Sequence, residues 1–199
     1  MKKLSVIITI LLSLSYFAQA QTSGYKPGDK AIDFNLKGTD GNFQSLASLS
    51  KGKGFIVIFT CNHCPFSQAY EQRIIALHKK YAPKGMPVVA INPNDSAREP
   101  EDSYDNMKKR AKKYKYPFVY LVDENQAIAK AYGAMRTPHV YVLDANRNVI
   151  YIGAIDDNFE DAKLVKEKYL ENALDAFLSG KPILNPVTKA IGCGIKWKK

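Results

Sequence analysis

Cysteine is scarce in this chain of 199 residues, which contains only three. Two of them, Cys61 and Cys64, stand three positions apart directly after an apolar run. The chain lacks the second cysteine pair that a closed zinc site would need, and Pro65 stands where c-type haem attachment requires a histidine. These absences favour redox chemistry at the Cys-x-x-Cys pair. They leave open a structural disulfide or two inert thiols.

Long apolar runs are also missing, because no stretch approaches the roughly 18 apolar residues of a transmembrane helix. Residues 1–20 have the pattern of a secretory signal: two lysines, a short apolar run, and Ala18-Gln19-Ala20 as a small-x-small cleavage site. No cysteine follows that site, so a lipid anchor has no support. We expect an exported chain, periplasmic or extracellular, that begins at Gln21 in an oxidising compartment.

Acidic residues are the minority, with 19 Asp and Glu against 29 Lys and Arg and a formal net charge of +10. Removal of the two signal lysines leaves +10 − 2 = +8. The lysines are densest over residues 108–115, where we expect a solvated helix face and no nucleic-acid partner. The remaining 199 − 20 = 179 residues fit one domain over 21–199, with 181–199 as a C-terminal tail packing on it.

Apolar patterning predicts an α/β protein with a central mixed sheet and helices on both faces. Residues 55–59 are five consecutive apolar residues, typical of a strand buried on both faces, and we expect this strand to be the central one. Other strands are predicted at 31–36, 86–91, 118–122, 140–143 and 149–152 (the last two as a hairpin), and helices at 64–82, 101–114, 126–132 and 160–178. The cysteine pair therefore lies at a strand-to-helix junction.

This junction suits disulfide exchange. Because a helix N-terminus stabilises negative charge, we predict a depressed pKa for Cys61 and assign it the attack, with Cys64 one turn inside the helix as the resolving thiol. Pro65 is tolerated in a first helical turn. His63 is predicted to stabilise the Cys61 thiolate; the alternative is a solvent-facing histidine with little coupling. Residues 55–59 contain no carboxylate, so His63 or a water would have to accept the proton of Cys64.

Several segments match a known pattern: 31–36 with Asp40-Gly41, 59–65, 88–92 with 94–95, 100–103, 120–124, 131–134, Thr137-Pro138, Asp156-Asp157 and 191–198. The Cys-Asn-His-Cys-Pro motif and the Gly-Cys-x-Ile-Lys-Trp tail are the most specific of them. Together they resemble the thioredoxin superfamily, and specifically exported, peroxiredoxin-like proteins related to the alkyl hydroperoxide reductase / thiol-specific antioxidant group. The resemblance covers nearly all of the mature chain and implies a thioredoxin-like fold.

The resemblance also implies that Pro138 is a cis-proline facing the cysteines, with Thr137 before it. A cis-proline there exposes backbone groups that can pair with a bound peptide strand. Arg136 either adds positive charge near the thiolate or is an ordinary surface arginine.

Two activities share this family. Peroxiredoxins carry Thr-x-x-Cys before Pro, whereas here Cys61 replaces the Thr and Cys64 takes the peroxidatic position. A peroxidase interpretation makes Cys64 the peroxide-attacking thiolate, with Cys61 or Cys193 as its resolving partner. Exchange makes Cys61 the nucleophile. We favour exchange, because loss of the Thr removes a hydroxyl that orients peroxide.

Cys193 is the odd thiol, and its neighbours Gly192 and Gly194 allow close backbone approach. We expect it near the active site as a resolving or auxiliary thiol; the alternatives are dimerisation or burial as a small apolar residue. The sequence thus predicts a thiol-disulfide oxidoreductase without cofactor or metal, acting on protein thiols or a redox partner protein. A thiol peroxidase is the second interpretation, and a Cu(I)-binding module using Cys61, Cys64 and His63 is the third.

Overall fold

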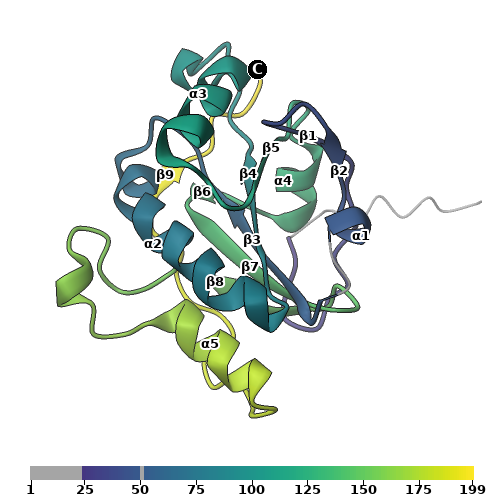
Figure 1. Cartoon of the computed structure of the whole chain (residues 1–199), viewed down its shortest axis with the longest axis vertical. Coiled ribbons are helices and arrows are strands. Elements are labelled where there is room, and N and C mark those ends of the chain that lie inside the picture. Colours follow the sequence, from purple (N-terminus) through teal and green to yellow (C-terminus); the bar gives the residue numbers. More distant parts are fainter. Residues whose placement is uncertain (1–23, 50–51) are drawn as a thin grey trace, which may run out of the picture.

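The computed structural model describes residues 24–49 and 52–199, so the predicted signal segment 1–20 lies outside the described residues. Within them, one mixed sheet has the strand order β2-β1-β5-β4-β3-β7-β8, and β6 pairs separately with β9 (Figure 1). The strands are β1 (Leu36–Gly38), β2 (Phe43–Gln44), β3 (Gly54–Phe59), β4 (Val88–Asn92), β5 (Val119–Val122), β6 (Arg136–Thr137), β7 (His139–Asp144), β8 (Val149–Gly153) and β9 (Cys193–Gly194). The helices are α1 (Leu46–Leu49), α2 (Pro65–Tyr81), α3 (Tyr104–Tyr114), α4 (Ala127–Tyr132) and α5 (Tyr169–Leu178), with short 3-10 turns at Ala82–Lys84, Pro100–Asp102 and Ala162–Leu164.

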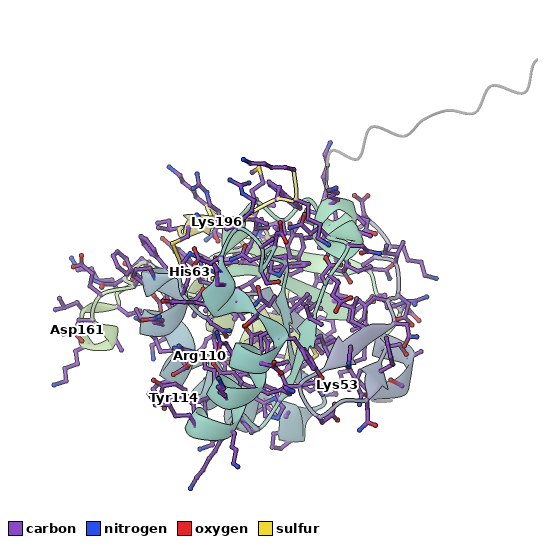
Figure 2. All side chains as sticks on the ribbon, turned by 90° about the horizontal axis from the view of Figure 1, so that it is seen from above. Lys53, His63, Arg110, Tyr114, Asp161 and Lys196 are labelled. Atoms are coloured by element: carbon purple, nitrogen blue, oxygen red, sulfur yellow. A yellow bond between two sulfur atoms is a disulfide. The ribbon has the colours of Figure 1, made fainter. Side chains whose placement is uncertain are left out.

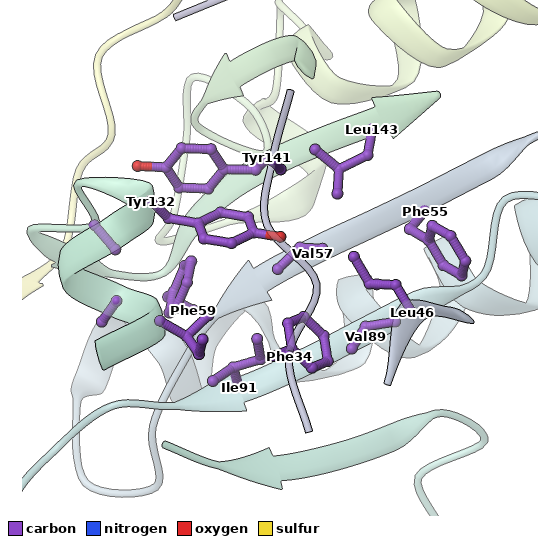
Figure 3. Close-up of a cluster of buried hydrophobic side chains, with 14 of the residues drawn as sticks. Phe34, Leu46, Phe55, Val57, Phe59, Val89, Ile91, Tyr132, Tyr141 and Leu143 are labelled. Atoms are coloured by element: carbon purple, nitrogen blue, oxygen red, sulfur yellow. The ribbon is translucent and has the colours of Figure 1, made fainter. Parts of the chain in front are cut away.

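The predicted mixed sheet with helices on both faces is confirmed. Successive side chains of a strand point to opposite faces, so β3 contributes Phe55, Val57 and Phe59 to one apolar cluster and Ile56 and Ile58 to another. The first cluster is closed by α1 and α4, as Figure 3 shows for the tyrosine of α4 that lies against Phe59. The second is closed by α2 and α5, while α3 packs on the same face at β4 and β5.

Every residue of β3 is buried, as predicted for its apolar run. The strand lies between β4, which runs parallel to it, and β7, which runs antiparallel. It is interior but not central, since β4 occupies the middle of the seven strands. The reason is that the N-terminal arm adds β1 and β2 beyond β5 and so shifts the midpoint of the sheet by one strand.

Two predicted elements are wrong in part. The strand expected over 31–36 begins only at Leu36, because Ala31 and Phe34 are buried three positions apart while Ile32 is 46% exposed, which breaks the period of two. The helix expected over 160–178 begins only at Tyr169. The residues before it form a loop that closes on itself, where the Asp157 amide donates to the carbonyl of Glu167 at 3.2 Å.

The other predicted strands and helices are present, with ends shifted by one to three residues, and the β7-β8 hairpin is confirmed. Across residues 24–49 and 52–199, no helix combines the length and apolarity needed to cross a bilayer. The tail beyond α5 runs back along β8, where the Thr188 amide donates to the carbonyl of Ile152 at 2.9 Å. It then passes to β6, where β9 places Cys193 opposite Thr137, and the C-terminus lies farther on, near α3 (Figure 1).

Candidate redox site

The cysteine motif occupies the turn between β3 and α2, as predicted. Cys64 is the residue directly before the helix, with an extended backbone (φ −66°, ψ 124°), and Pro65 is the first helical residue. Proline forces the residue before it out of the helical region, so the helix cannot begin earlier. The expectation that Cys61 stands at the helix start and Cys64 one turn inside is therefore wrong: the helix N-terminus faces Cys64.

The disulfide of the structure joins Cys64 to Cys193, with 6.1 Å between their Cα atoms, and Cys61 is a free, buried thiol. The Cys61–Cys64 pair that the spacing suggested is not closed. Contacts between segments far apart in the sequence decide which sulfurs pair. Strand β9 pairs antiparallel with β6, and this register sets Cys193 opposite Thr137, next to the motif.

Close approach of the tail depends on Gly192. A Cβ on this residue would lie 2.3 Å from the carbonyl oxygen of Thr137, so only glycine fits. A Cβ on Gly194 would meet nothing within 4 Å, so the predicted need for glycine is confirmed at one flank of Cys193 only. Arg136 is exposed, and its Nη1 donates to the carbonyl of Gly192 at 3.3 Å. It therefore contacts the tail.

Polar contacts on both sides hold the end of the tail. Asn94 accepts from the Lys196 amide at 2.9 Å, and the buried Gln126 donates to the Lys196 carbonyl at 2.9 Å and accepts from the Lys198 amide at 2.8 Å. Ile195 is buried in the apolar core between them. Sequence reasoning assigned no role to Asn94 or Gln126, because a side chain that binds a distant backbone leaves no periodic signal.

The Thr137-Pro138 peptide bond is cis, which confirms the expectation drawn from the resemblance. Thr137 is fully buried; its hydroxyl oxygen lies 3.2 Å from the sulfur of Cys61, and its carbonyl oxygen lies 3.2 Å from the sulfur of Cys64. The backbone edge expected to bind a peptide strand is taken by the chain's own tail, since β6 pairs with β9. Thr137 therefore touches both motif sulfurs and the tail strand.

Cys61 does not have the depressed pKa predicted for it. Burial and, to a lesser extent, the negative charge of Asp102 raise the pKa of Cys61 from 9.0 to about 11, because the hydrogen bonds from Thr137, the Cys64 amide and Ser67 offset these two effects only in part. The Ser67 hydroxyl lies 3.7 Å from the sulfur. Because the side chain is 4% exposed and faces a carboxylate, its neutral form is favoured.

His63 contacts carboxylates on both sides. Its Nδ1 lies 2.7 Å from Asp102 and its Nε2 lies 3.4 Å from Glu99. Asp102 is almost fully buried and also accepts from the Asn62 amide at 2.5 Å and from the Asn94 side chain at 2.7 Å. Any positive charge on His63 is therefore shared with two carboxylates, so the predicted stabilisation of the Cys61 thiolate by this histidine is offset by Asp102.

Asp102 is the functional residue that sequence reasoning missed. The strand before the motif contains no carboxylate, and Asp102 comes instead from a 3-10 turn after β4. Ligand atoms of Cys61, His63 and Asp102 lie within 4.8 Å of one another, a grouping that could hold a metal ion. The Cu(I) interpretation also requires Cys64 as a thiolate, and the structure places that sulfur in a disulfide.

Known proteins share both the sequence pattern and the fold. Residues 27–152, which include the motif and Thr137 but not Cys193, match the AhpC/TSA family. "Peroxiredoxin Q, chloroplastic" from Oryza sativa subsp. japonica is 30% identical over 156 residues, which are 70% of this chain and 63% of that protein. "Thiol-disulfide oxidoreductase ResA" from Geobacillus thermodenitrificans is 24% identical over 151 residues, 72% of this chain and 80% of that one.

Among solved structures, an uncharacterized conserved protein from Geobacillus kaustophilus superposes with a TM-score of 0.82 at 40% identity, covering 87% of this chain and 93% of that one. The chain spans less than two thirds of the length of the rice protein. The sheet and its helices form the thioredoxin-like fold that the resemblance implied. Since the matched residues make up more than half of the sequence, this protein belongs to the AhpC/TSA family.

Proposed function

We propose that this protein is a thiol-disulfide oxidoreductase whose reactive sulfur is Cys64. The observation that carries the proposal is the pairing of Cys64 with Cys193 at the N-terminus of α2. A thiolate released at that position meets the positive end of the helix dipole. Cys61, with a pKa of about 11, is a neutral thiol at pH 7 and is not the first attacker.

The reaction begins at the exposed side of the disulfide. Cys193 is half-buried and Cys64 is fully buried, so a thiolate of a partner dithiol attacks the Cys193 sulfur and the S–S bond breaks with its electron pair on Cys64. A low pKa of the leaving thiol speeds this step. The partner's second thiolate then attacks the partner sulfur of the mixed disulfide, and Cys193 leaves. The partner is oxidised to a disulfide, Cys64 and Cys193 are reduced, and the two partner protons pass to solvent or to the released thiolates.

Cys61 serves as a second partner for Cys64. The Cys64 amide donates to the Cys61 sulfur, and both motif sulfurs contact Thr137. Once Cys61 loses its proton, its thiolate attacks Cys64 and Cys193 leaves with that proton. This step moves the disulfide into the Cys-x-x-Cys motif without net oxidation.

Stoichiometric exchange tests the assignment. The oxidised protein is mixed with a dithiol peptide, and peptide disulfide is counted by mass spectrometry. One disulfide per protein is expected for the wild type and for Cys61→Ser, and none for Cys64→Ser; Cys193→Ser is expected to exchange only through a Cys61–Cys64 disulfide. Loss in Cys61→Ser with retention in Cys193→Ser would move the redox centre to the motif pair. A Cys64–Cys193 bond that dithiothreitol reduces only in the unfolded protein would make it structural.

A thiol peroxidase is the second candidate, and the same disulfide favours it. A Cys64 thiolate that reduces a hydroperoxide becomes a sulfenic acid and releases the alcohol; the Cys193 thiol then condenses with it, losing water and leaving a Cys64–Cys193 disulfide. This is the bond in the structure. The similarity to peroxiredoxin Q supports the candidate, while the cysteine in place of the threonine weighs against it.

Reduced protein without added reductant separates the two activities. A peroxidase consumes one hydroperoxide per Cys64 within seconds and forms the Cys64–Cys193 bond, which is read by mass mapping. Cys64→Ser then abolishes consumption, and Cys61→Ser retains it. Slow consumption equal to that of free cysteine, together with rapid exchange against a disulfide peptide, leaves oxidoreductase as the function.

We also propose that the protein works outside the cytoplasm, after cleavage near Ala20. The signal pattern of residues 1–20 supports export, and the disulfide chemistry suits an oxidising compartment. Cell fractionation followed by N-terminal sequencing tests this. A cytoplasmic protein that retains Met1 or Lys2 would contradict it.

A further inference from the structure

A pocket beside the redox motif carries charges that the exchange chemistry does not use. It lies between the start of α2 and helix α3 and is lined by Asn62 and Gln68 on one side and Asn106, Lys109 and Lys113 on the other. Arg110 and Tyr114, also part of its wall, lie along the same flank of the molecule as His63 in Figure 2.

One stripe of α3 forms this wall. Positions 106, 109, 110 and 113 are three or four residues apart, the spacing that puts side chains on one face of a helix. Lys108 and Lys112 have the same charge but lie off this face and do not line the pocket. The dense lysines of the helix therefore form two populations, and only one of them faces the motif.

Some of the positively charged side chains that line the pocket are not paired with a carboxylate. Arg110 is engaged, since its Nε donates to the buried Glu71 at 2.6 Å. Lys109 and Lys113 are exposed, and among the described residues no carboxylate lies within ion-pair distance of either. Glu101 is the acidic residue of the lining, and it leaves a surplus of one positive charge beyond the Arg110–Glu71 pair.

The floor of the pocket is the redox loop itself. Gln68 donates to the carbonyl of Asn62 at 2.8 Å, and Asn62 donates to the carbonyl of Glu101 at 2.9 Å. A group seated in the pocket thus touches the residue that follows Cys61. Such a group is in place to hold a partner while one of its thiols reaches the disulfide.

We propose that this pocket docks an acidic segment of the thiol partner, with carboxylates next to the reacting cysteine. The proposal rests on the oxidoreductase function above and names its substrate class. Lys109 and Lys113 are four helical residues apart, a rise of about 6 Å. Carboxylates two residues apart on an extended peptide are separated by about 6.6 Å, so alternate acidic residues match the lysine pair.

Three dithiol peptides test the preference. They are identical except at two alternate positions beside the cysteine, which carry Glu, Ser or Lys. With the oxidised full-length protein, the second-order rate constant of single-turnover peptide oxidation is expected to fall from Glu to Ser to Lys, by about fivefold to tenfold between the extremes at low salt, and the three values are expected to converge as salt screens the charges. Equal rate constants for the three peptides would overturn the docking role.

A matched pair of variants localises the effect. Lys109→Glu/Lys113→Glu is expected to invert the peptide order, while Lys108→Glu/Lys112→Glu, with the same charge change on the same helix, is expected to keep it. Circular dichroism and single-turnover oxidation of dithiothreitol, which is uncharged, test whether each oxidised variant is folded and active. If both variants change the order equally, the preference comes from overall charge and the pocket is not the site.

Different outcomes would contradict the oxidoreductase function and the docking role of the pocket. If the wild type oxidises neither dithiothreitol nor any peptide, the oxidoreductase function is wrong and the docking role falls with it. If it oxidises all of them at one rate, only the docking role is wrong. Competition by single-stranded oligonucleotide, with no preference among the peptides, would identify the lysine pair as a nucleic-acid surface instead.

Discussion

The two ends of one four-residue motif have opposite environments. Cys61 lies two residues beyond the end of β3, and burial together with the carboxylate of Asp102 raises its pKa to about 11. Cys64, which is also buried, stands directly before α2, meets the positive end of the helix, and is bonded to the tail at Cys193. Two cysteines three positions apart therefore differ, since one is a free thiol beside a carboxylate and the other is half of a disulfide at a helix N-terminus. The spacing of a Cys-x-x-Cys motif does not say which is which.

Removing the Cys64–Cys193 disulfide should have the largest effect on the free energy of unfolding. Cys64 and Cys193 are 129 residues apart, and opening a loop of that length is expected to lower the free energy of unfolding by about 4–5 kcal/mol. Cys61→Ser should cost only about 1 kcal/mol, because the hydroxyl can still bond to Thr137 and Ser67. Urea titrations of Cys193→Ser, Cys61→Ser and the oxidised wild type measure both. A larger loss in Cys61→Ser would reverse the comparison.

Thiol reactivity should separate the two sulfurs by about a hundredfold. A pKa raised from 9.0 to about 11 reduces the thiolate fraction of Cys61 at pH 7 by about a factor of 100, whereas Cys64, although also buried, lies directly before α2, where the positive end of the helix dipole favours a thiolate. Reduced Cys193→Ser protein is treated with iodoacetamide at pH 7, and labelling of the two sites is followed by peptide mass spectrometry. Equal rates would show that the helix N-terminus does not favour Cys64. Unfolded protein in urea provides the baseline ratio.

Alkaline pH should expose the cost of ionising Cys61. Its folded pKa lies above its unfolded value, so the unfolded state loses the proton first, and the stabilising contribution is complete below pH 9 and is lost as pH rises through about 11. The free energy of unfolding is expected to fall by about 2–3 kcal/mol over this range. Cys61→Ser should lack it, while the buried tyrosines, whose pKa values are also raised, affect both proteins alike. Parallel curves for the two proteins from pH 8 to 10.5 would contradict the buried-thiol assignment.

Neutralising Asp102 should lower the pKa of Cys61 and so reduce the difference between the two ends of the motif. Asp102→Asn keeps the shape of the side chain but removes the charge, and the pKa of Cys61 should fall by about one unit. Titration of ¹³C-labelled Cys61 by NMR in the oxidised protein reads this thiol directly, because Cys64 and Cys193 are paired. Glu99→Gln is the matched control, since Glu99 also faces His63 but is absent from the contributors at Cys61. An equal shift in both variants would assign the effect to His63.

Local pattern was sufficient for most of the framework. The buried run of β3, the helix that begins at Pro65 and the β7-β8 hairpin were predicted from residues near one another, because burial period and proline geometry act over a few residues. Prediction failed at 31–35, where the buried positions do not keep a period of two, and at 160–168, where apolar residues are sparse.

Composition and spacing by themselves determined that this chain carries a Cys-x-x-Cys pair at a strand-to-helix turn and a third, glycine-flanked cysteine, whose place near the pair was an expectation. Only the tertiary structure decided which sulfurs pair and which thiol is protected. Asp102 and Cys193 reach the motif from 38 and 129 residues away, through a 3-10 turn and a two-residue strand. Burial and Coulomb interaction depend on distance in space, and no pattern local to Cys61 or Cys64 records that distance.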